Sequence, residues 1–232
     1  MGLGLGASGP HGPVFADLLS DAQQQRLLSV ALTRHVKKKR EVFQAGDEID
    51  GLYLIEDGLV QITLASPNDK GMVVNRYGPG DIFGEMGVLD DLPRSANAVA
   101  VEDTNLRFIR STAFLDYLRQ EPDVSIIVMR ILTQRLRRTS SALADALFLG
   151  LEPRLAKVLL ELAATHGIDT PNGRQISIIM SQYEIGQTIA FSRESTNKTL
   201  KKWQEKGLVT HQDGIVTIHD PERLLEITEN YD

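Results

Sequence analysis

Residues 83–99 read FGEMGVLDDLPRSANAV, a segment that combines a glycine-rich turn with one glutamate, one arginine and one serine. A glycine turn exposes backbone N–H groups, and an arginine fork beside such donors and a hydroxyl suits an isolated phosphodiester. Glu85 cannot bind that anion, but a carboxylate accepts a hydrogen bond from a ribose hydroxyl in other nucleotide sites. The residues therefore fit a cyclic phosphodiester with its ribose. A surface turn held by an Arg94–Glu85 salt bridge is the alternative.

The sequence around this segment predicts a β-rich domain. Short apolar runs lie at 53–55, 59–64, 72–77 and 97–101, and they are separated by the turn sequences AGD, EDG, SPNDKG and GPGD. Short strands at close spacing with glycine turns are typical of a β-roll or barrel.

Helical spacing precedes this domain, from about residue 14 to 30, and Ser20 is placed to cap a second helix over Asp21–Leu32. The basic stretch 33–40 follows. We expect a solvated strand edge protected by lysines there, and a nucleic-acid-binding arm is the alternative.

A helical pattern returns after Ser111. Glu121-Pro122 separates a short helix, Ser111–Arg119, from a long one that runs from Asp123 to about Leu149. One apolar stripe runs along the long helix, and its successive residues are four or seven positions apart: Val128, Leu132, Leu136, Leu143 and Leu147. A narrow stripe on so long a helix favours a coiled-coil dimer seam, with an ordinary core helix as the alternative.

The last third of the chain predicts a small helical domain. Gly150–Pro153 is a hinge with Pro153 at the first position of a new amphipathic helix, and 166–175 is a turn-rich connection. Two helices follow at 181–189 and 193–206. A terminal hairpin then turns at Asp213-Gly214, a strong two-residue turn signal.

Residues 181–209 have the pattern of a helix-turn-helix. The expected buried face consists of four apolar side chains: Ile185, Ile189, Leu200 and Trp203. Ser192 is a good N-cap for the second helix, whose first turns present polar side chains as a base-reading helix requires. An arginine guanidinium can donate two hydrogen bonds to guanine O6 and N7, and a glutamate carboxylate can accept one from cytosine N4. Five basic and two acidic residues give 193–206 a local charge of +3 in a chain of net charge −6. An ordinary αα-hairpin is the alternative.

Residues 83–96, with GDEIDGLYLIEDGLVQI (46–62) and GPGDIFGE (78–85), resemble the phosphate-binding cassette and β-roll of cyclic-nucleotide-binding domains. Residues 14–220 as a whole resemble the Crp–Fnr superfamily of bacterial transcription regulators. The resemblance implies an α+β chain with an N-terminal cyclic-nucleotide-binding β-roll (jelly roll), a long dimerisation helix and a C-terminal winged helix-turn-helix. It also implies three parts: the nucleotide domain (14–122), the dimerisation helix and hinge (123–150) and the DNA-binding domain (151–232). The glycine-rich composition of residues 1–13 predicts a flexible tail before them.

The family resemblance implies cyclic AMP as the allosteric ligand, with cyclic GMP or ligand-free activity as alternatives. Glycine–glutamate and arginine–serine pairs of the cassette hold the ribose and the cyclic phosphate in that family. The expected ligand-binding residues are Val74, Phe83, Gly84, Glu85, Met86, Arg94, Ser95, Ala96, Arg135, Thr139 and Ser140. Thr139 and Ser140 match a pair that meets the purine from both subunits, although hydroxyls that bond back along the helix are the alternative.

The resemblance also implies a homodimer that binds a double-stranded DNA operator and contacts RNA polymerase. The expected DNA-binding residues are Ser181, Gln182, Ser192, Arg193, Glu194, Ser195, Asn197, Lys198, Lys201 and Lys202. Two departures matter. Ala190 stands where the turn usually has glycine, and Lys198 stands where the family has a second base-reading arginine and cannot form the same fork. The Asp213-Gly214 hairpin is expected either to flank the DNA backbone or to be purely structural.

Composition excludes several other classes of protein. The 232 residues contain no cysteine, so disulfides, thiolate catalysis and cysteine-bound metals, including an iron–sulfur sensor, are excluded. The five histidines form no local metal-ligand pair, His35 alone is weak evidence for haem, and no catalytic dyad or kinase-type phosphate loop is present. We therefore expect neither an enzyme nor a metal cofactor. A non-DNA subunit regulated by the same β-roll is the remaining alternative. The absence of an apolar span and of a basic leader predicts a cytoplasmic protein with no membrane partner.

Overall fold

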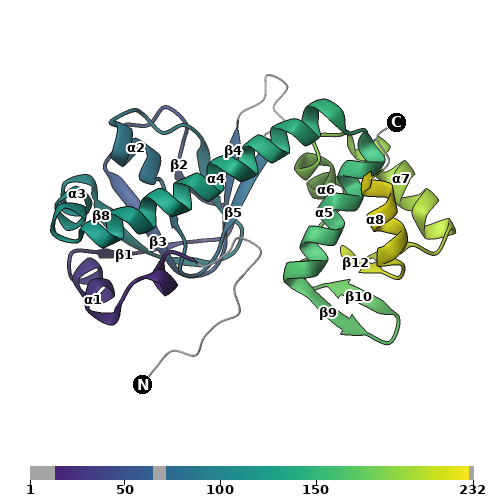
Figure 1. The fold of residues 1–232 in the computed structure, drawn as a ribbon, viewed down its shortest axis with the longest axis horizontal. Helices are drawn as coiled ribbons and strands as arrows, with labels where there is room; N and C mark the ends of the chain where they lie inside the picture. Colours follow the sequence, from purple (N-terminus) through teal and green to yellow (C-terminus); the bar gives the residue numbers. More distant parts are fainter. Residues whose placement is uncertain (1–13, 65–71, 230–232) are drawn as a thin grey trace. The chain divides into compact units, whose positions relative to one another are not determined.

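The chain divides into two compact units, Met1–Leu136 and Arg137–Asp232 (Figure 1). The computed structural model describes residues 14–64 and 72–229. Among these residues, no helix is both long and apolar enough to cross a membrane.

Two four-stranded antiparallel sheets form the β-roll of the N-terminal unit, with strand orders β1-β8-β3-β6 and β2-β7-β4-β5. The strands are β1 (Leu32–Val36), β2 (Glu41–Phe43), β3 (Gly51–Asp57), β4 (Val60–Leu64), β5 (Met72–Tyr77), β6 (Ile82–Phe83), β7 (Asn97–Ala100) and β8 (Thr104–Arg110). The four apolar runs of the sequence correspond to β3, β4, β5 and β7, which confirms the predicted β-roll. β8, which pairs with both β1 and β3, was not predicted.

An aromatic core lies inside the roll and supports the glycine-rich segment. Tyr53 of β3 stacks on Phe83 of β6, with ring centres 5.2 Å apart, and both side chains are buried. Tyr77 and Phe108 pack against the same pair. Since Phe83 is the first residue of the segment 83–99, burial of its ring holds that segment against the sheet.

The first half of the basic stretch 33–40 forms an edge of the roll, as predicted, but Lys37, Lys38 and Lys39 lie in the connection after β1 and not on the strand. β1 is the outer strand of its sheet, and the side chains of residues 32–35 and 37–40 are exposed. The charged residue on the edge strand is Arg34, and a charged side chain there opposes pairing with another chain.

The N-terminal helix is shorter than the sequence pattern predicted. Within residues 14–19 the structure has only a 3₁₀ turn, η1 (Ala16–Leu18), and α1 covers Asp21–Ser29. Ser20 caps α1 as expected, in a reciprocal capping box with Gln23. The predicted extension to Leu32 is wrong because Leu32 begins β1, where pairing with β8 replaces the helical hydrogen bonds.

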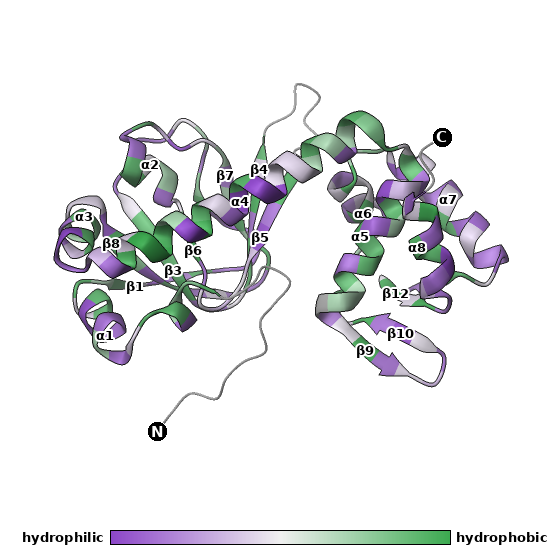
Figure 2. Ribbon diagram, in the orientation of Figure 1, coloured by the Kyte–Doolittle hydropathy of each residue, from purple (hydrophilic) through white to green (hydrophobic). Residues whose placement is uncertain are grey.

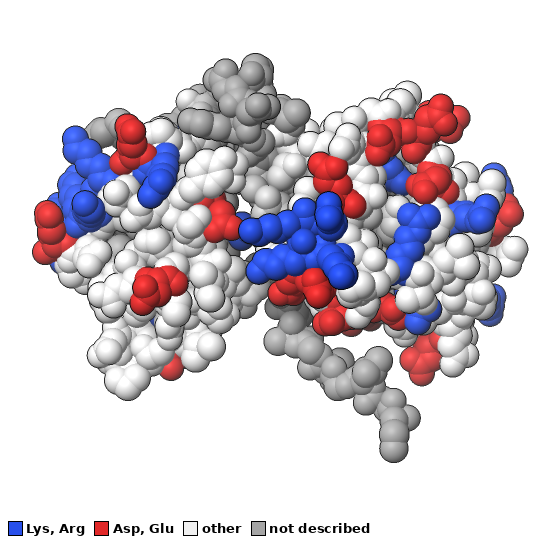
Figure 3. Space-filling model, turned by 180° about the vertical axis from the view of Figure 1, so that it is seen from behind, with Lys and Arg blue, Asp and Glu red and all other residues white. Residues whose placement is uncertain are grey.

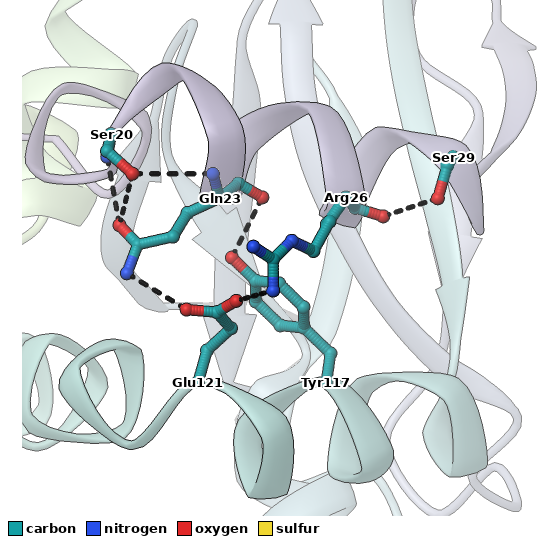
Figure 4. Close-up of polar contacts among 6 residues, drawn as sticks. All are labelled: Ser20, Gln23, Arg26, Ser29, Tyr117 and Glu121. Atoms are coloured by element: carbon teal, nitrogen blue, oxygen red, sulfur yellow. Dashed lines mark hydrogen bonds and ion pairs between the residues drawn. The ribbon is translucent and has the colours of Figure 1, made fainter.

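Polar contacts attach α1 to α3 (Ser111–Gln120), as Figure 4 shows. The Tyr117 hydroxyl donates to the backbone oxygen of Gln23 at 3.0 Å, and Gln23 Nε2 donates to Glu121. Arg26 forms an ion pair with the same carboxylate. Burial, and then the charge of Glu121, raise the pKa of Tyr117 to about 12, so this hydroxyl remains a donor at neutral pH.

The long helix α4 covers Pro122–Phe148, but its apolar stripe has two different environments. Val128 is 3% exposed and packs in the core of the N-terminal unit, and Leu132 is half-buried beside it. Leu136, Leu143 and Leu147 are 66%, 59% and 69% exposed. Figure 2 shows apolar residues recurring along α4. The prediction that the whole stripe forms a dimer seam is therefore wrong for the first half of α4, which packs as an ordinary core helix of its own unit.

The C-terminal unit contains helices α5 (Leu151–His166), α6 (Gln182–Thr188), α7 (Arg193–Glu205) and α8 (Pro221–Glu229). Its sheet has the order β11-β12-β10-β9, from β9 (Gly167–Thr170), β10 (Gly173–Ile176), β11 (Val209–Gln212) and β12 (Ile215–Ile218). α8 packs on α5 (Figure 1), and the sequence analysis missed this helix.

Two predictions for this unit are corrected and one is confirmed. Pro153 is the third residue of α5, not the first; proline is tolerated there because the N–H groups of a first turn have no partner in the helix. The turn-rich connection contains the β9–β10 hairpin. Asp213 and Gly214 have φ of 52° and 80° and turn the predicted β11–β12 hairpin.

Ala190, in the turn between α6 and α7, has φ of 58°, in the left-handed region that disfavours a Cβ atom. We expect Ala190→Gly to raise the free energy of unfolding by about 0.5–1 kcal/mol, because relief of strain exceeds the entropic cost of glycine. Urea unfolding measures this change. Ala164→Gly, at an exposed position of α5, is the control and should lower stability. A loss of stability in both variants would contradict the strain.

Candidate functional site

The segment 83–96 turns sharply between β6 and the short helix α2 (Glu85–Asp90). Gly84 is the residue before α2 and has φ of 79°. A Cβ atom at this position would lie 2.7 Å from Arg94 Nη1. Backbone conformation and the close approach of Arg94 therefore both require glycine here.

Arg94 lies beneath this turn and is only 4% exposed. Its Nη1 donates to Gly84 O at 2.8 Å, and its Nη2 donates to Asp50 Oδ1 at 2.9 Å and to Gly51 O at 2.6 Å. The guanidinium carbon lies 4.3 Å from the centre of the Phe43 ring. Arg94 is thus held by the protein on several sides, in a position that packing and hydrogen bonds determine together.

The guanidinium group nevertheless retains hydrogen-bonding capacity. Arginine has five N–H donors, and the buried Nε of Arg94 has no partner among the described residues. Buried donors are normally satisfied, so an unpaired one at a glycine turn calls for an acceptor. Ser95, the next residue, is exposed. A donor without a partner and a neighbouring exposed hydroxyl are the groups that a phosphate would use.

Glu85 is paired with the long helix and not with Arg94. Its side chain is 3% exposed, and Oε1 lies 2.6 Å from Nη1 of Arg135 on α4. Arg135 Nη2 also donates to Ile82 O at 2.6 Å. The Arg94–Glu85 salt bridge considered from the sequence is therefore wrong: Arg94 pairs with Asp50, and Glu85 pairs with Arg135.

Electrostatic effects at this pair keep Arg135 charged. Burial lowers the pKa of Arg135, but Glu85 and other nearby groups outweigh it, and the net shift is upward. The guanidinium carbon lies 4.4 Å from the ring centre of Tyr77. Burial is also the main cause that raises the pKa of Tyr77 to about 12. The pair therefore orients the carboxylate of Glu85 and attaches the cassette to α4.

The structure brings four of the predicted ligand-binding residues together: Gly84, Glu85, Arg94 and Arg135. Phe83 and Ala96 are buried supports, and Val74, Met86 and Ser95 are exposed. Thr139 and Ser140 are exposed on α4, on the other side of the boundary at Leu136.

Sequence reasoning missed Asp50. The available signal was an acidic residue directly before the buried strand β3, because a buried arginine needs a carboxylate or carbonyl acceptor. No group of three or more histidine, aspartate or glutamate side chains within 14–64 and 72–229 is placed to hold a metal ion.

A second candidate surface lies on the helices α6 and α7. Ser181 caps α6 in a capping box with Glu184, and Ser192 caps α7 by accepting from Ser195 N at 3.1 Å. The four apolar residues predicted for the buried face are all buried: Ile185, Ile189, Leu200 and Trp203. This confirms the predicted two-helix arrangement.

The polar residues of α7 differ in their surroundings. Seven of the predicted DNA-binding residues in this region are exposed: Ser192, Arg193, Glu194, Ser195, Lys198, Lys201 and Lys202. Asn197 is half-buried, and its buried Oδ1 has no partner among the described residues. Lys202 is exposed and pairs with Glu152 of α5 at 2.5 Å. Figure 3 shows basic side chains gathered on the α7 side of this unit, with acidic ones among them.

A shallow hollow joins the start of α6, the start of α7 and the β11–β12 turn. Ser181, Gln182 and Arg193 line it, and so do Asp213 and Gly214 of the hairpin. The predicted helix-turn-helix and the predicted wing therefore share one continuous surface.

Two family models match the chain, and together they cover both units. A model described as a cyclic nucleotide-binding domain matches residues 33–121, and a Crp-like helix-turn-helix domain matches residues 153–227.

Curated relatives and solved structures agree with these matches. The chain is 33% identical to a CRP-like cAMP-activated global transcriptional regulator of Mycobacterium tuberculosis, over 79% of this chain and 82% of that protein. It is 30% identical to the cyclic AMP receptor protein of Thermus thermophilus, over 86% and 89% of the two chains. The structure of the c-di-GMP-responsive global regulator CLP of Xanthomonas campestris superposes with a TM-score of 0.78 at 25% identity, covering 86% of this chain and 99% of that one.

Proposed function

We propose that this chain, which belongs to the Crp–Fnr family of cyclic-nucleotide-binding transcription regulators, responds to cyclic AMP and binds a pseudo-palindromic DNA operator as a homodimer. Family membership rests on the two domain matches and on relatives that are at least 30% identical over most of their length. The family consists of regulators and not of enzymes. The identity of the ligand, the dimer and the operator go beyond that membership.

The observation that carries the nucleotide assignment is the unpaired Nε of Arg94. The cyclic phosphate would accept from this donor and from the exposed Ser95 hydroxyl, beside the glycine turn at Gly84. Charge-assisted bonds of this kind are short and strong. Because Arg94 is already oriented by Asp50 and two backbone oxygens, little ordering is needed when the ligand binds.

Glu85 is the group that we assign to the ribose. One carboxylate oxygen accepts from Arg135, which leaves the other available to a sugar hydroxyl. A ligand that bonds to Glu85 therefore acts on a residue whose partner belongs to α4. This arrangement would couple occupation of the site to the position of the long helix.

The exposed apolar residues on the second half of α4 support the homodimer. Leu136, Leu143 and Leu147 lie at seven- and four-residue spacing and are exposed in the single chain. A helix that leaves such a stripe uncovered suits a second copy of itself. In the dimer two copies of α7 would enter successive major grooves, with RNA polymerase contacted by the bound regulator.

We propose cyclic AMP and not cyclic GMP as the ligand because the names of several relatives include cyclic AMP. The similar Xanthomonas structure, in contrast, is of a c-di-GMP-responsive regulator. The experiment that decides is calorimetric titration of the purified protein with each of these three nucleotides. It is followed by operator binding in each saturated state at constant salt. The proposal requires tighter operator binding with cyclic AMP than with no ligand, and an equal affinity in both states would overturn it.

Thr139 and Ser140 are the residues that we assign to the purine. The double variant Thr139→Ala/Ser140→Ala should retain most of its affinity for cyclic AMP, since the phosphate contacts are unchanged. It should lose about tenfold of the nucleotide-dependent gain in operator affinity, because a ligand shifts an equilibrium only by its differential affinity for two states. Operator titrations with no ligand, cyclic AMP and cyclic GMP measure this. Ser141→Ala, at the next exposed hydroxyl on α4, is the control. If the double variant kept the wild-type gain in operator affinity and the wild-type discrimination between the two nucleotides, other residues would control the response.

A further inference from the structure

One arginine of α5 contacts two other segments of the C-terminal unit, the end of α4 and the turn between α6 and α7. Arg154, in the first turn of α5, donates from Nη2 to Ala146 O and from Nε to Leu149 O at the C-terminal end of α4, at 2.9 and 3.1 Å. Its Nη1 donates to Ile189 O at 2.9 Å, directly after α6. The guanidinium carbon lies 4.8 Å from the centre of the Phe191 ring.

The acceptors explain why an arginine occupies this position. The last carbonyl groups of a helix have no partner within it, and they carry the negative end of the helix dipole. Two such ends, those of α4 and α6, converge on Arg154. A planar fork can satisfy both ends and still stack on an aromatic ring, whereas a lysine has a single nitrogen.

The α6–α7 turn, which accepts a hydrogen bond from Arg154, leads directly into α7, the helix that we propose binds DNA. Phe191 is followed by Ser192, the N-cap of α7, and by Arg193, its first residue. Two other contacts join the same elements in pairs: Lys157 and Asp145 join α5 to α4, and Lys202 and Glu152 join α7 to α5. Arg154 links the end of α4, α5 and the α6–α7 turn through one group.

We infer that Arg154 is a positioning residue that attaches the turn before α7 to the C-terminal end of α4, so that the DNA-binding helix follows that end when it moves. The inference rests on the proposed function, because it gives the ligand-dependent state of α4 a physical connection to α7. It assigns Arg154 no contact with DNA or nucleotide.

The test compares Arg154→Ala with Arg154→Lys and with a matched control, Arg174→Ala. Arg174 is an arginine of the same unit that donates to Ala163 O of α5 and pairs with Asp169, so its loss removes a similar set of bonds at a distance from the α6–α7 turn in sequence. Fluorescence anisotropy measures the affinity for a duplex selected by the wild-type protein from a random pool, with and without saturating cyclic AMP. Hydrogen exchange of the amides of residues 189–194 is measured on the same free proteins.

Arg154→Ala should reduce the ratio of the two operator affinities by at least about fivefold, while its affinity for cyclic AMP remains within about twofold of the wild type. Amides 189–194 should exchange at least about tenfold faster, because the turn has lost its attachment. Arg154→Lys should fall between the wild type and Arg154→Ala. Arg174→Ala should match the wild type in both readouts even if its melting temperature falls.

Wild-type exchange at 189–194 together with a wild-type affinity ratio in Arg154→Ala would overturn the inference and leave the proposed function intact. If the wild-type protein itself showed no response to nucleotide, the proposed function would fail. The exchange of residues 189–194 would then still decide whether Arg154 positions the turn.

Discussion

Replacing Arg94 by alanine is expected to weaken cyclic AMP binding at least about a hundredfold, which corresponds to about 3 kcal/mol. The loss has two causes: the charge-assisted bonds to the phosphate disappear, and the Gly84 turn loses the donor that holds its backbone oxygen. Isothermal titration calorimetry measures the change. An affinity within about threefold of the wild type would contradict the assignment of the cassette.

The same substitution should also destabilise the protein, because Arg94 is buried and donates to three protein oxygens. We expect the free energy of unfolding to fall by about 2–3 kcal/mol, so titrations should be made well below the melting temperature of the variant. Arg94→Lys keeps the charge but loses the fork. It should lose most of the affinity with a smaller loss of stability, which separates binding from folding.

Arg107→Ala is the matched control for this experiment. Arg107 lies on β8, its Nε forms an ion pair with Glu56 Oε1 at 2.7 Å, and its Nη1 donates to Thr33 Oγ1 at 2.7 Å. Its removal should lower stability but leave the affinity for cyclic AMP within about twofold of the wild type. A large loss of affinity in this control would show that general loosening of the roll, and not a missing phosphate contact, explains the effect.

Arg193→Ala is expected to weaken operator binding by about 1–3 kcal/mol and to relax the preference at one base pair. Arg193 is the first residue of α7, is exposed and lines the hollow between α6 and the β11–β12 turn. At that position its fork can reach a guanine edge when the helix lies in a major groove. Competition between the operator and single-base variants, at constant salt, measures the change in preference.

Lys201→Ala provides the contrast, because an exposed lysine further along α7 is expected to contact phosphate. The substitution should weaken binding to operator and to random DNA to the same extent, and it should reduce the dependence of the affinity on salt concentration. Lys202 is less suitable for this purpose, since it is already paired with Glu152. If Arg193→Ala lowered the affinities for operator and random DNA equally, its base-reading role would be wrong.

Local features of the structure could be predicted because neighbouring residues determine them. Ser20 and Ser192 cap their helices, and Asp213-Gly214 turns its hairpin, through contacts within a few residues. The resemblance of 83–96 to a known cassette located the turn in the same way. These predictions needed no knowledge of the rest of the chain.

Contacts between distant residues could not be predicted. Asp50 lies 44 residues before Arg94, and Glu85 lies 50 residues before Arg135. Their pairing depends on how the two sheets and α4 pack. The spacing of apolar residues likewise identifies one face of α4, but not that its own unit covers Val128 and leaves Leu143 exposed. The four-residue strands β9 and β10 were missed because pairing, and not a long apolar pattern, defines them.

The position of the single tryptophan has an experimental consequence. Trp203 is the only tryptophan in the sequence, and it is buried in α7. Its emission therefore reports on the solvent shielding of the C-terminal unit alone, whereas far-ultraviolet circular dichroism follows the secondary structure of both units. Denaturation curves that differ between the two signals would show that the units do not unfold as one cooperative system. The protein thus carries its own optical probe for whether its two halves are energetically independent.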